Sequence, residues 1–387
     1  MEHDFIITTF FLIFTGAAIF ATLALFTRQS LLVAYIVLGM LLGPYGLKWI
    51  DNPDFVTQAS DVGIIFLLFL LGLNLHPQNL VHMFRKTFVI TVLSSVIFAF
   101  VGMLISRYVG FSLLECLIVG MTMTFSSTII GLKLLPTTVL HHQRMGELII
   151  SILLLQDLVA IIMMLLIGTE QTVNFYHILW LLIALPALIV ISFLVENYVL
   201  LKLLSRFDKI KEYIFLMAIG WCLGVAQIAY WLGLSYEIGA FIAGVSIAVG
   251  PIALFIAESL KPLRDFFLVM FFFSLGANFN ITSMPNIFIP ALVLAAAMLV
   301  LKPFVFNFLL RNNSENGARS WEIGVRLGQV SEFSLLVGFM AYKNQFLSLD
   351  AYQLIELATI ITFIASSYAV VLYYPTPIAL DDKLRRD

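Results

Sequence analysis

The sequence predicts an all-α polytopic membrane protein with about 13 transmembrane helices, and three observations lead to this prediction. First, 61% of the 387 residues are apolar and only 11% are charged, too few to cover a soluble core of this size. Second, apolar segments long enough to cross a bilayer follow one another along the chain. Third, the basic residues between these segments alternate between rich and poor connections, as they do in multi-pass proteins.

The apolar segments predict where the transmembrane helices lie. They cover residues 5–26, 31–47, 56–73, 88–106, 113–135, 146–168, 175–200, 212–233, 236–254, 265–282, 286–310, 320–342 and 351–375. Glu2 and Asp4 precede the first segment without any Lys or Arg, so we interpret it as a retained span rather than a cleavable signal peptide. The charged stretch from Glu258 to Arg264, which contains Pro262, is expected to separate the ninth segment from the tenth.

The distribution of basic residues favours one orientation. Of the 21 basic residues, 16 lie on or beside one set of connections, whereas the other set holds Lys48, Arg107 and Lys343. The positive-inside rule then places the N-terminus outside and the C-terminus in the cytoplasm, which requires an odd number of spans. We therefore expect a multi-pass protein of the cell (inner) membrane.

A weak internal repeat relates the two halves of the chain. Residues 69–75 resemble residues 273–279 at an offset of 204, and Gly43-Pro44 recurs as Gly250-Pro251 at an offset of 207. Because the first half starts outside and the second starts inside, the halves would be inverted, an arrangement typical of secondary transporters. The expected organisation is a single transport domain (1–387) with a first repeat (5–168), a linker helix (175–204), a second repeat (211–375) and a short cytoplasmic tail (376–387).

One acidic residue lies near the middle of a span. Asp157, preceded by Gln156, sits in the apolar stretch 149–167. A charged carboxylate at this depth costs at least ~2.5 kcal/mol on insertion scales, and such residues usually mark ion or proton pathways. A buried aspartate satisfied by a hydroxyl or cation on another helix is the alternative.

Two other spans contain polar clusters at corresponding positions. Residues 122–128 include five hydroxyls, among them Thr124, Ser126, Ser127 and Thr128. The second cluster, at an offset of 205, is formed by Gln329, Ser331 and Glu332. We expect both spans to be unwound there, so that exposed carbonyls and half-helix ends can bind a cation. In ordinary helices the same hydroxyls would bond back to the preceding turn.

Lys302 is a basic residue within an apolar span and is followed by Pro303. We interpret it as a counter-charge for the two polar clusters or for Asp157, which would keep the empty site close to neutral. Its alternative is to snorkel toward the inner surface. Arg326 is expected to be a surface anchor at the inner start of its span.

Other classes of site find no support in the sequence. No basic cluster with interleaved aromatic residues lies outside the spans, so nucleic-acid binding is not expected. Cys116 and Cys222 lie singly in apolar runs and indicate neither a redox pair nor a metal site. We expect a transporter rather than an enzyme, without a cofactor.

The order and spacing of these motifs resemble the cation:proton antiporter-2 family, in particular the Kef-type potassium efflux transporters. The matching stretches are Gly39–Leu47, Val62–Gly72, Phe125-Ser-Ser-Thr128, Leu155-Gln-Asp-Leu158, Gly239–Gly244 and Leu327–Phe333. The resemblance implies a sodium/proton antiporter-like fold and a homodimer, in which a core of spans 4–6 and 11–13 moves against a static part. It also implies that Asp157 binds the cation (K⁺ or Na⁺) and the proton, with Gln156 beside it and Lys302 as the basic residue of the core.

The chain departs from the Kef pattern in two places. Asn74 stands in Gly72-Leu-Asn74-Leu where Kef members usually have Glu. The cytosolic nucleotide-binding domain of that group is not in the sequence, which contains no Gly-x-Gly-x-x-Gly motif. A regulatory domain or subunit would then be a separate partner or belong to a longer form of the chain.

The predicted function is exchange of a monovalent cation for a proton by alternating access, with K⁺ favoured over Na⁺ by the resemblance. A ligand-gated K⁺ channel would use the same polar residues to line a pore, and a membrane sensor would need no transport at all. Both alternatives remain open at the level of the sequence.

Overall fold

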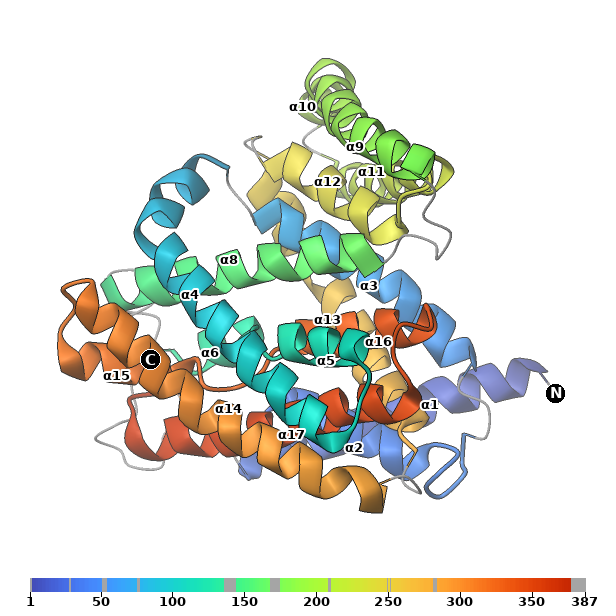
Figure 1. Ribbon diagram of the computed structural model, residues 1–387. Coiled ribbons are helices and arrows are strands. Elements are labelled where there is room, and N and C mark those ends of the chain that lie inside the picture. Colours follow the sequence, from blue (N-terminus) through green and yellow to red (C-terminus); the bar gives the residue numbers. More distant parts are fainter. Residues whose placement is uncertain are drawn as a thin grey trace.

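The computed structural model is built of helices throughout the residues that it describes (Figure 1). These are residues 2–27, 29–50, 54–74, 77–135, 144–167, 175–207, 210–248, 250, 252–280 and 284–376. The α-helices are α1 (Glu2–Phe26), α2 (Leu31–Leu42), α3 (Asp54–Asn74), α4 (Pro77–Val109), α5 (Leu113–Thr122), α6 (Thr128–Lys133), α8 (Arg144–Ile167), α9 (Phe175–Val195), α10 (Leu201–Arg206), α11 (Lys211–Trp231), α12 (Tyr236–Ala248), α13 (Ala253–Asn278), α14 (Met284–Asn312), α15 (Gly317–Arg326), α16 (Glu332–Lys343) and α17 (Leu349–Tyr373). A π-helical turn, η1 (Glu196–Leu200), joins α9 to α10.

The prediction of an all-helical membrane protein is confirmed. Within the described ranges, eight helices are long and apolar enough to cross a bilayer, and they correspond to α1, α3, α4, α8, α9 with its continuation to Arg206, α11, α14 and α17. The remaining predicted spans are occupied by shorter, split or more highly charged helices. The predicted tail lies outside the described residues from position 377 onward.

The predicted break at residues 258–264 is wrong. Helix α13 runs without interruption from Ala253 to Asn278 and includes Pro262. Lys261 and Pro262 are exposed, so the polar groups of this turn project from the helix instead of ending it. The break lies earlier, beside Gly250, after α12 has ended at Ala248.

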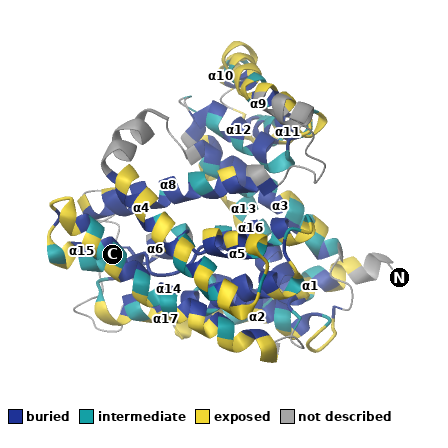
Figure 2. Cartoon of the chain, in the orientation of Figure 1, coloured by how far each residue is buried: buried dark blue, intermediate teal, exposed yellow. Residues whose placement is uncertain are grey.

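The two main clusters of buried apolar residues share helices α3 and α13. The largest joins residues of α2–α6, α8 and α13–α17, and a second joins residues of α3 and α9–α13. In Figure 1, α9–α12 accordingly lie together at one end of the molecule, while α4, α5, α14 and α17 lie at the other. Figure 2 shows that α8 is buried along most of its length and that the outward faces of α9, α10 and α14 are exposed.

Two pairs of helices cross at glycine residues. Gly39 of α2 lies against the backbone of α13, and Gly276 of α13 lies against Ile36 of α2. Gly72 of α3 and Gly244 of α12 meet in the same way. Small residues at helix crossings in membranes allow the backbones to approach closely, so these four positions set the packing of α2, α3, α12 and α13.

We expect Gly244→Val to destabilise the protein, because a Cβ at this position would overlap the carbonyl of Phe69 and approach the amide of Leu73 at 2.9 Å. Overpacking of this kind typically costs about 1–3 kcal/mol. Gly220→Val is the matched control, since a Cβ there meets no atom within 4 Å. Thermal unfolding in detergent should show a lower midpoint for the first variant only, and equal midpoints would contradict the packing described.

Candidate ion-binding site

Two spans are interrupted where the sequence places its polar clusters. Helix α5 ends at Thr122 and α6 begins at Thr128, and we name residues 123–127 between them the first crossing segment. Helix α15 ends at Arg326 and α16 begins at Glu332, and residues 327–331 form the second crossing segment. The two segments contact each other directly. Ser126 Oγ donates to the Leu327 carbonyl at 2.9 Å, and Gln329 Nε2 donates to the Ser127 carbonyl at 3.3 Å.

Hydroxyl groups stabilise the ends of the broken helices. Ser127 Oγ accepts from the Ile130 amide at 3.1 Å, and Ser331 Oγ accepts from the Phe333 amide at 3.1 Å, so both serines cap the helices that follow. Thr124 Oγ1 instead donates to the Met121 carbonyl at 2.7 Å, which is the local bond-back expected of a hydroxyl in a regular helix. This bond uses the hydroxyl proton and leaves the oxygen lone pairs, so a role of Thr124 as a cation ligand stays a prediction.

Asp157 lies in the middle of α8 and is 1% exposed. Its Oδ2 accepts a hydrogen bond from Thr128 Oγ1 at 3.0 Å, at the first residue of α6. Its Oδ1 is buried and has no hydrogen-bond partner among the described residues. A buried carboxylate oxygen without a partner costs free energy, which a proton or a bound cation would recover.

In the neighbouring Gln156 side chain, too, one polar atom is hydrogen-bonded and the other is not. Its Oε1 accepts from the Ser126 amide at 2.9 Å and so holds the first crossing segment against α8. Its Nε2 is buried without a hydrogen-bond partner in the described part of the chain. The two adjacent side chains therefore each use one atom to fix the local backbone and leave the other atom available.

Lys302 projects from α14 into the contact between the two crossing segments and is fully buried. Its Nζ donates to the Phe125 carbonyl at 2.6 Å and to the Gln329 carbonyl at 3.0 Å, and it lies 3.4 Å from Ser126 Oγ. These are carbonyls of both crossing segments, and the partners recorded for Lys302 do not include Asp157. The ammonium also lies 5.5 Å from the centre of the Phe98 ring.

Lys302 supplies positive charge to the polar backbone between the broken helices. The C-terminal ends of α5 and α15 precede the crossing segments, and each helix end carries about half a negative charge. The ammonium binds the carbonyls of Phe125 and Gln329, just beyond these two ends, so it stabilises backbone dipoles of both crossing segments.

Glu332 occupies the first turn of α16 and is 8% exposed. This is the end of a helix that favours a negative charge, and Ser331 Oγ lies 3.5 Å from its Oε2. A negative charge on Glu332 therefore complements the positive end of α16.

The sequence analysis missed the contribution of α17. Thr362 Oγ1 accepts from the Val330 amide at 3.0 Å, and Ser366 Oγ donates to Gln329 Oε1 at 2.9 Å, so α17 holds the second crossing segment. Thr359, Thr362 and Ser366 are spaced by three and four residues and are all buried. This helical stripe of hydroxyls within an apolar span was the available signal.

The structure corrects the expectation that Arg326 is a surface anchor. Arg326 is the last residue of α15, is 2% exposed and donates hydrogen bonds to three other residues. It donates to the carbonyls of Leu134 at 2.9 Å and Pro375 at 2.8 Å, and it pairs with Glu322 at 2.8 Å. A guanidinium group can serve three acceptors at once, so Arg326 ties α15 to the residues that follow α6 and α17.

We expect Lys302→Gln to lower the thermal stability of the protein in detergent. The change leaves the Phe125 and Gln329 carbonyls without their charged donor, and a hydrogen bond to a charged group is worth about 1.5–3 kcal/mol. Lys202→Gln on α10 is the control, because this lysine is exposed and should contribute less than ~1 kcal/mol. Equal melting curves for the unsubstituted protein and both variants would show that the bonds from Lys302 to these carbonyls do not stabilise the fold.

Comparisons with known proteins agree with this geometry. The family model described as "Sodium/hydrogen exchanger, transmembrane" matches residues 10–372. Among curated relatives, the iron transporter MagA of Paramagnetospirillum magneticum (strain ATCC 700264 / AMB-1) is 24% identical over 344 residues, which cover 88% of this chain and 79% of the relative.

A solved structure shares the fold. The sodium proton antiporter MjNhaP1 from Methanocaldococcus jannaschii, determined at pH 8, superposes with a TM-score of 0.69 at 18% sequence identity. The superposition covers 95% of this chain and 96% of the other. Since the family model spans nearly the whole chain and both crossing segments, the protein belongs to the sodium/hydrogen exchanger family of monovalent cation:proton antiporters.

Proposed function

We propose that Asp157 is the shared binding site for one monovalent cation and one proton, and that the protein exchanges the two by alternating access. The observation that carries this proposal is the buried Oδ1 of Asp157, which has no hydrogen-bond partner among the described residues. Thr128 and the carbonyls and hydroxyls of Ser126 and Ser127 would complete the cation ligands. Gln329 and Ser331 would hold the second crossing segment in place.

The mechanism is a competition for one negative charge. A proton and a dehydrated cation both neutralise Asp157, and each excludes the other. The loaded core is then neutral at this position and can move through the apolar barrier, whereas an empty core carries an uncompensated carboxylate at a high cost. Lys302 remains bound to backbone carbonyls in our scheme, so it is not the charge that Asp157 requires for balance. Obligatory exchange follows because only loaded cores cross.

We further propose that the two halves are inverted repeats and that spans 4–6 and 11–13 form a mobile core. The glycine contacts support the symmetry, since Gly39 and Gly244 are 205 residues apart, and Gly72 and Gly276 are 204 apart. A two-fold axis that relates α2 to α12 and α3 to α13 would exchange the two crossings. The contacts of Lys302 with both crossing segments support a core that moves as one body. The homodimer, the N-out orientation and the cell membrane location remain predictions from the sequence.

The cation that is exchanged remains a proposal on resemblance alone. The Kef-like motifs favour K⁺, and the similarity to a sodium proton antiporter supports Na⁺ equally well. A relative is named as an iron transporter, so Fe²⁺ belongs among the ions to be tested. Proton flux driven by each cation in proteoliposomes, measured across pH, would separate them, and unitary currents would instead favour a channel.

Asp157→Asn should abolish exchange in proteoliposomes and leave the fold intact. The amide keeps the size of the side chain but removes the charge and the titrating proton. Asp265→Asn is a matched control, because Asp265 is an exposed aspartate on α13 that pairs with Arg264. The control should exchange at the normal rate. If Asp157→Asn also does so, Asp157 is not the shared site. A physiological function that Asp157→Asn leaves intact would favour a membrane sensor.

Exchange should be electroneutral. Gln156 cannot titrate, so the pair Gln156–Asp157 offers one negative charge to either one proton or one monovalent cation. A membrane potential is worth about 2.3 kcal/mol per elementary charge per 100 mV, and it should leave a neutral cycle unaffected.

The measurement is the reversal point of cation and proton gradients in liposomes under an imposed potential that does not depend on the transported cation. A constant reversal ratio is expected. A ratio that moves with voltage would show net charge transfer and would require a second carrier, such as Glu332 or Lys302. Gln156→Asp supplies the positive comparison, since a second carboxylate should introduce voltage dependence.

A further inference from the structure

A second acidic side chain lies inside the core, away from the proposed site. Glu356 of α17 is fully buried, and neither of its carboxyl oxygens has a hydrogen-bond partner among the described residues. It lies seven residues into α17, about 10 Å from the start of the helix. An ionised carboxylate without a partner at this depth is far more costly than the neutral acid. This burial is therefore compatible with a bound proton.

Two stacked tyrosine rings lie between the helical turn that precedes Glu356 and a surface pocket. Tyr352 precedes Glu356 by one helical turn, is 4% exposed, and its hydroxyl is also buried without a partner in the described structure. The ring of Tyr352 stacks on that of Tyr342 of α16, with ring centroids 5.2 Å apart. Tyr342 in turn lines an open pocket of about 710 Å³ between the start of α5 and the α16–α17 connection.

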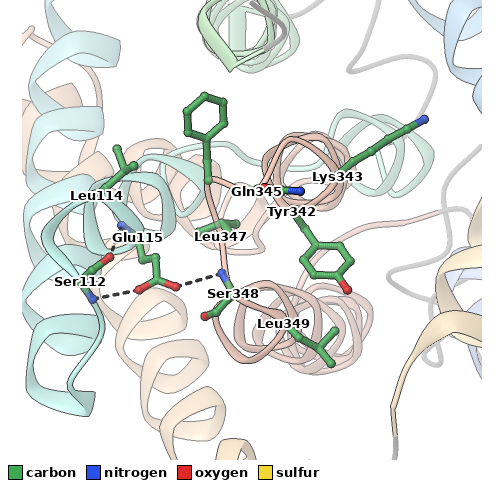
Figure 3. A pocket seen from close by; sticks show the side chains of 10 residues that line it. Ser112, Leu114, Glu115, Tyr342, Lys343, Gln345, Leu347, Ser348 and Leu349 are labelled. Carbon is green, nitrogen blue, oxygen red and sulfur yellow. Dashed lines mark hydrogen bonds between the residues drawn. The ribbon is translucent and has the colours of Figure 1, made fainter. Parts of the chain in front are cut away.

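Figure 3 shows this pocket, with Tyr342, Lys343 and Glu115 on its walls. Glu115 accepts hydrogen bonds from the amides of Ser112 and Ser348, each at 2.9 Å, which fixes the start of α17 against α5. Lys343 points away from the pocket and pairs with Asp61 of α3 at 2.8 Å. The pocket thus reaches the first turns of α17, on the side where Tyr342 covers Tyr352.

The other charged groups on the helices that pack against α17 have their own recorded interactions. Lys302 of α14 binds the crossing segments, Arg326 of α15 pairs with Glu322, and Glu332 of α16 lies beside Ser331. The remaining titratable groups on these helices are Tyr35 of α2, Glu115 and Cys116 of α5, Arg311 of α14, Arg319 of α15, and Tyr342 and Lys343 of α16. None of them bonds to the carboxyl of Glu356, whose oxygens are unpartnered in the described chain.

We propose that Glu356 is a second proton-binding site of the core, separate from Asp157, which exchanges its proton with the outer face through Tyr352 and the pocket beside Tyr342. The proton released or taken up there returns to the same side, so it is not counted in the exchange ratio. This inference rests on the proposed function only where it places the pocket on the outer face of the membrane. The protonated state of Glu356 does not depend on transport.

The position of Glu356 suggests how its proton affects the core. Thr362 and Ser366, which hold the second crossing segment, lie on the same helix, the first of them about 9 Å further along. Loss of the proton would place an unpaired charge among the apolar contacts of α17. The core would then repack or hydrate, and turnover would fall without a change in the competition at Asp157.

Infrared spectroscopy of the full chain in proteoliposomes tests the proton directly. In an Asp157→Asn background, the absorption of a protonated carboxylic acid should be present at neutral pH, and it should be lost when Glu356→Gln is added. In deuterated water this band should shift, because the proton exchanges with solvent, and Tyr352→Phe should slow the shift. Glu115→Gln is the matched control, because this carboxylate accepts two amide hydrogen bonds and should not contribute to the band.

Two spectroscopic results would overturn the proposal: no acid band that depends on Glu356, or a band that never exchanges. Transport supplies a second readout. Glu356→Gln mimics the neutral acid, so it should retain exchange at alkaline external pH where the native protein slows, with unchanged apparent cation affinity. A changed affinity would make Glu356 part of the cation site and would refute a separate role. If the protein transports nothing, the infrared result still decides the protonation.

Discussion

The contact of the Lys302 ammonium with the carbonyls of Phe125 and Gln329 is the interaction on which the site depends. Two interrupted helices cannot cross inside a membrane unless their free carbonyl ends are satisfied, because no water is available there. The Lys302 ammonium satisfies one carbonyl of each crossing segment. In the proposed mechanism Lys302 stays with these carbonyls, so Asp157 has no permanent partner of opposite charge and a transported ion can take that place.

The distribution of satisfied and unsatisfied groups gives the site its chemistry. Each crossing segment is held by a side chain of a long helix: Gln156 of α8 accepts from the Ser126 amide, and Thr362 of α17 accepts from the Val330 amide. Asp157 Oδ1, which has no hydrogen-bond partner in the described part of the chain, belongs to the residue next to Gln156. A ligand set built on a fixed backbone can bind one ion at a time without reorganising, which favours competition over simultaneous binding.

Several of these features could be predicted from the sequence, because their physical signal is local. Apolar length gave the spans, and the hydroxyls of residues 122–128 indicated where a helix would unwind. The break expected near Pro262 was wrong because exposed charged residues can lie on the outer face of a continuous helix. The sequence does not reveal which residues of a span are exposed. Arg326 was placed at the surface for the same reason. Its partners, the carbonyls of Leu134 and Pro375, are distant in the sequence and carry no side-chain signal.

The internal repeat is most informative where it fails. At an offset of 205, Asp157 corresponds to Thr362, and both lie on the helix that holds the crossing segment of their half. A threonine hydroxyl can fix a backbone amide but cannot carry a charge, whereas an aspartate can do both. In the proposed mechanism, only the position of Asp157 can therefore carry the charge for which cation and proton compete, while Thr362 serves the backbone of the second crossing segment.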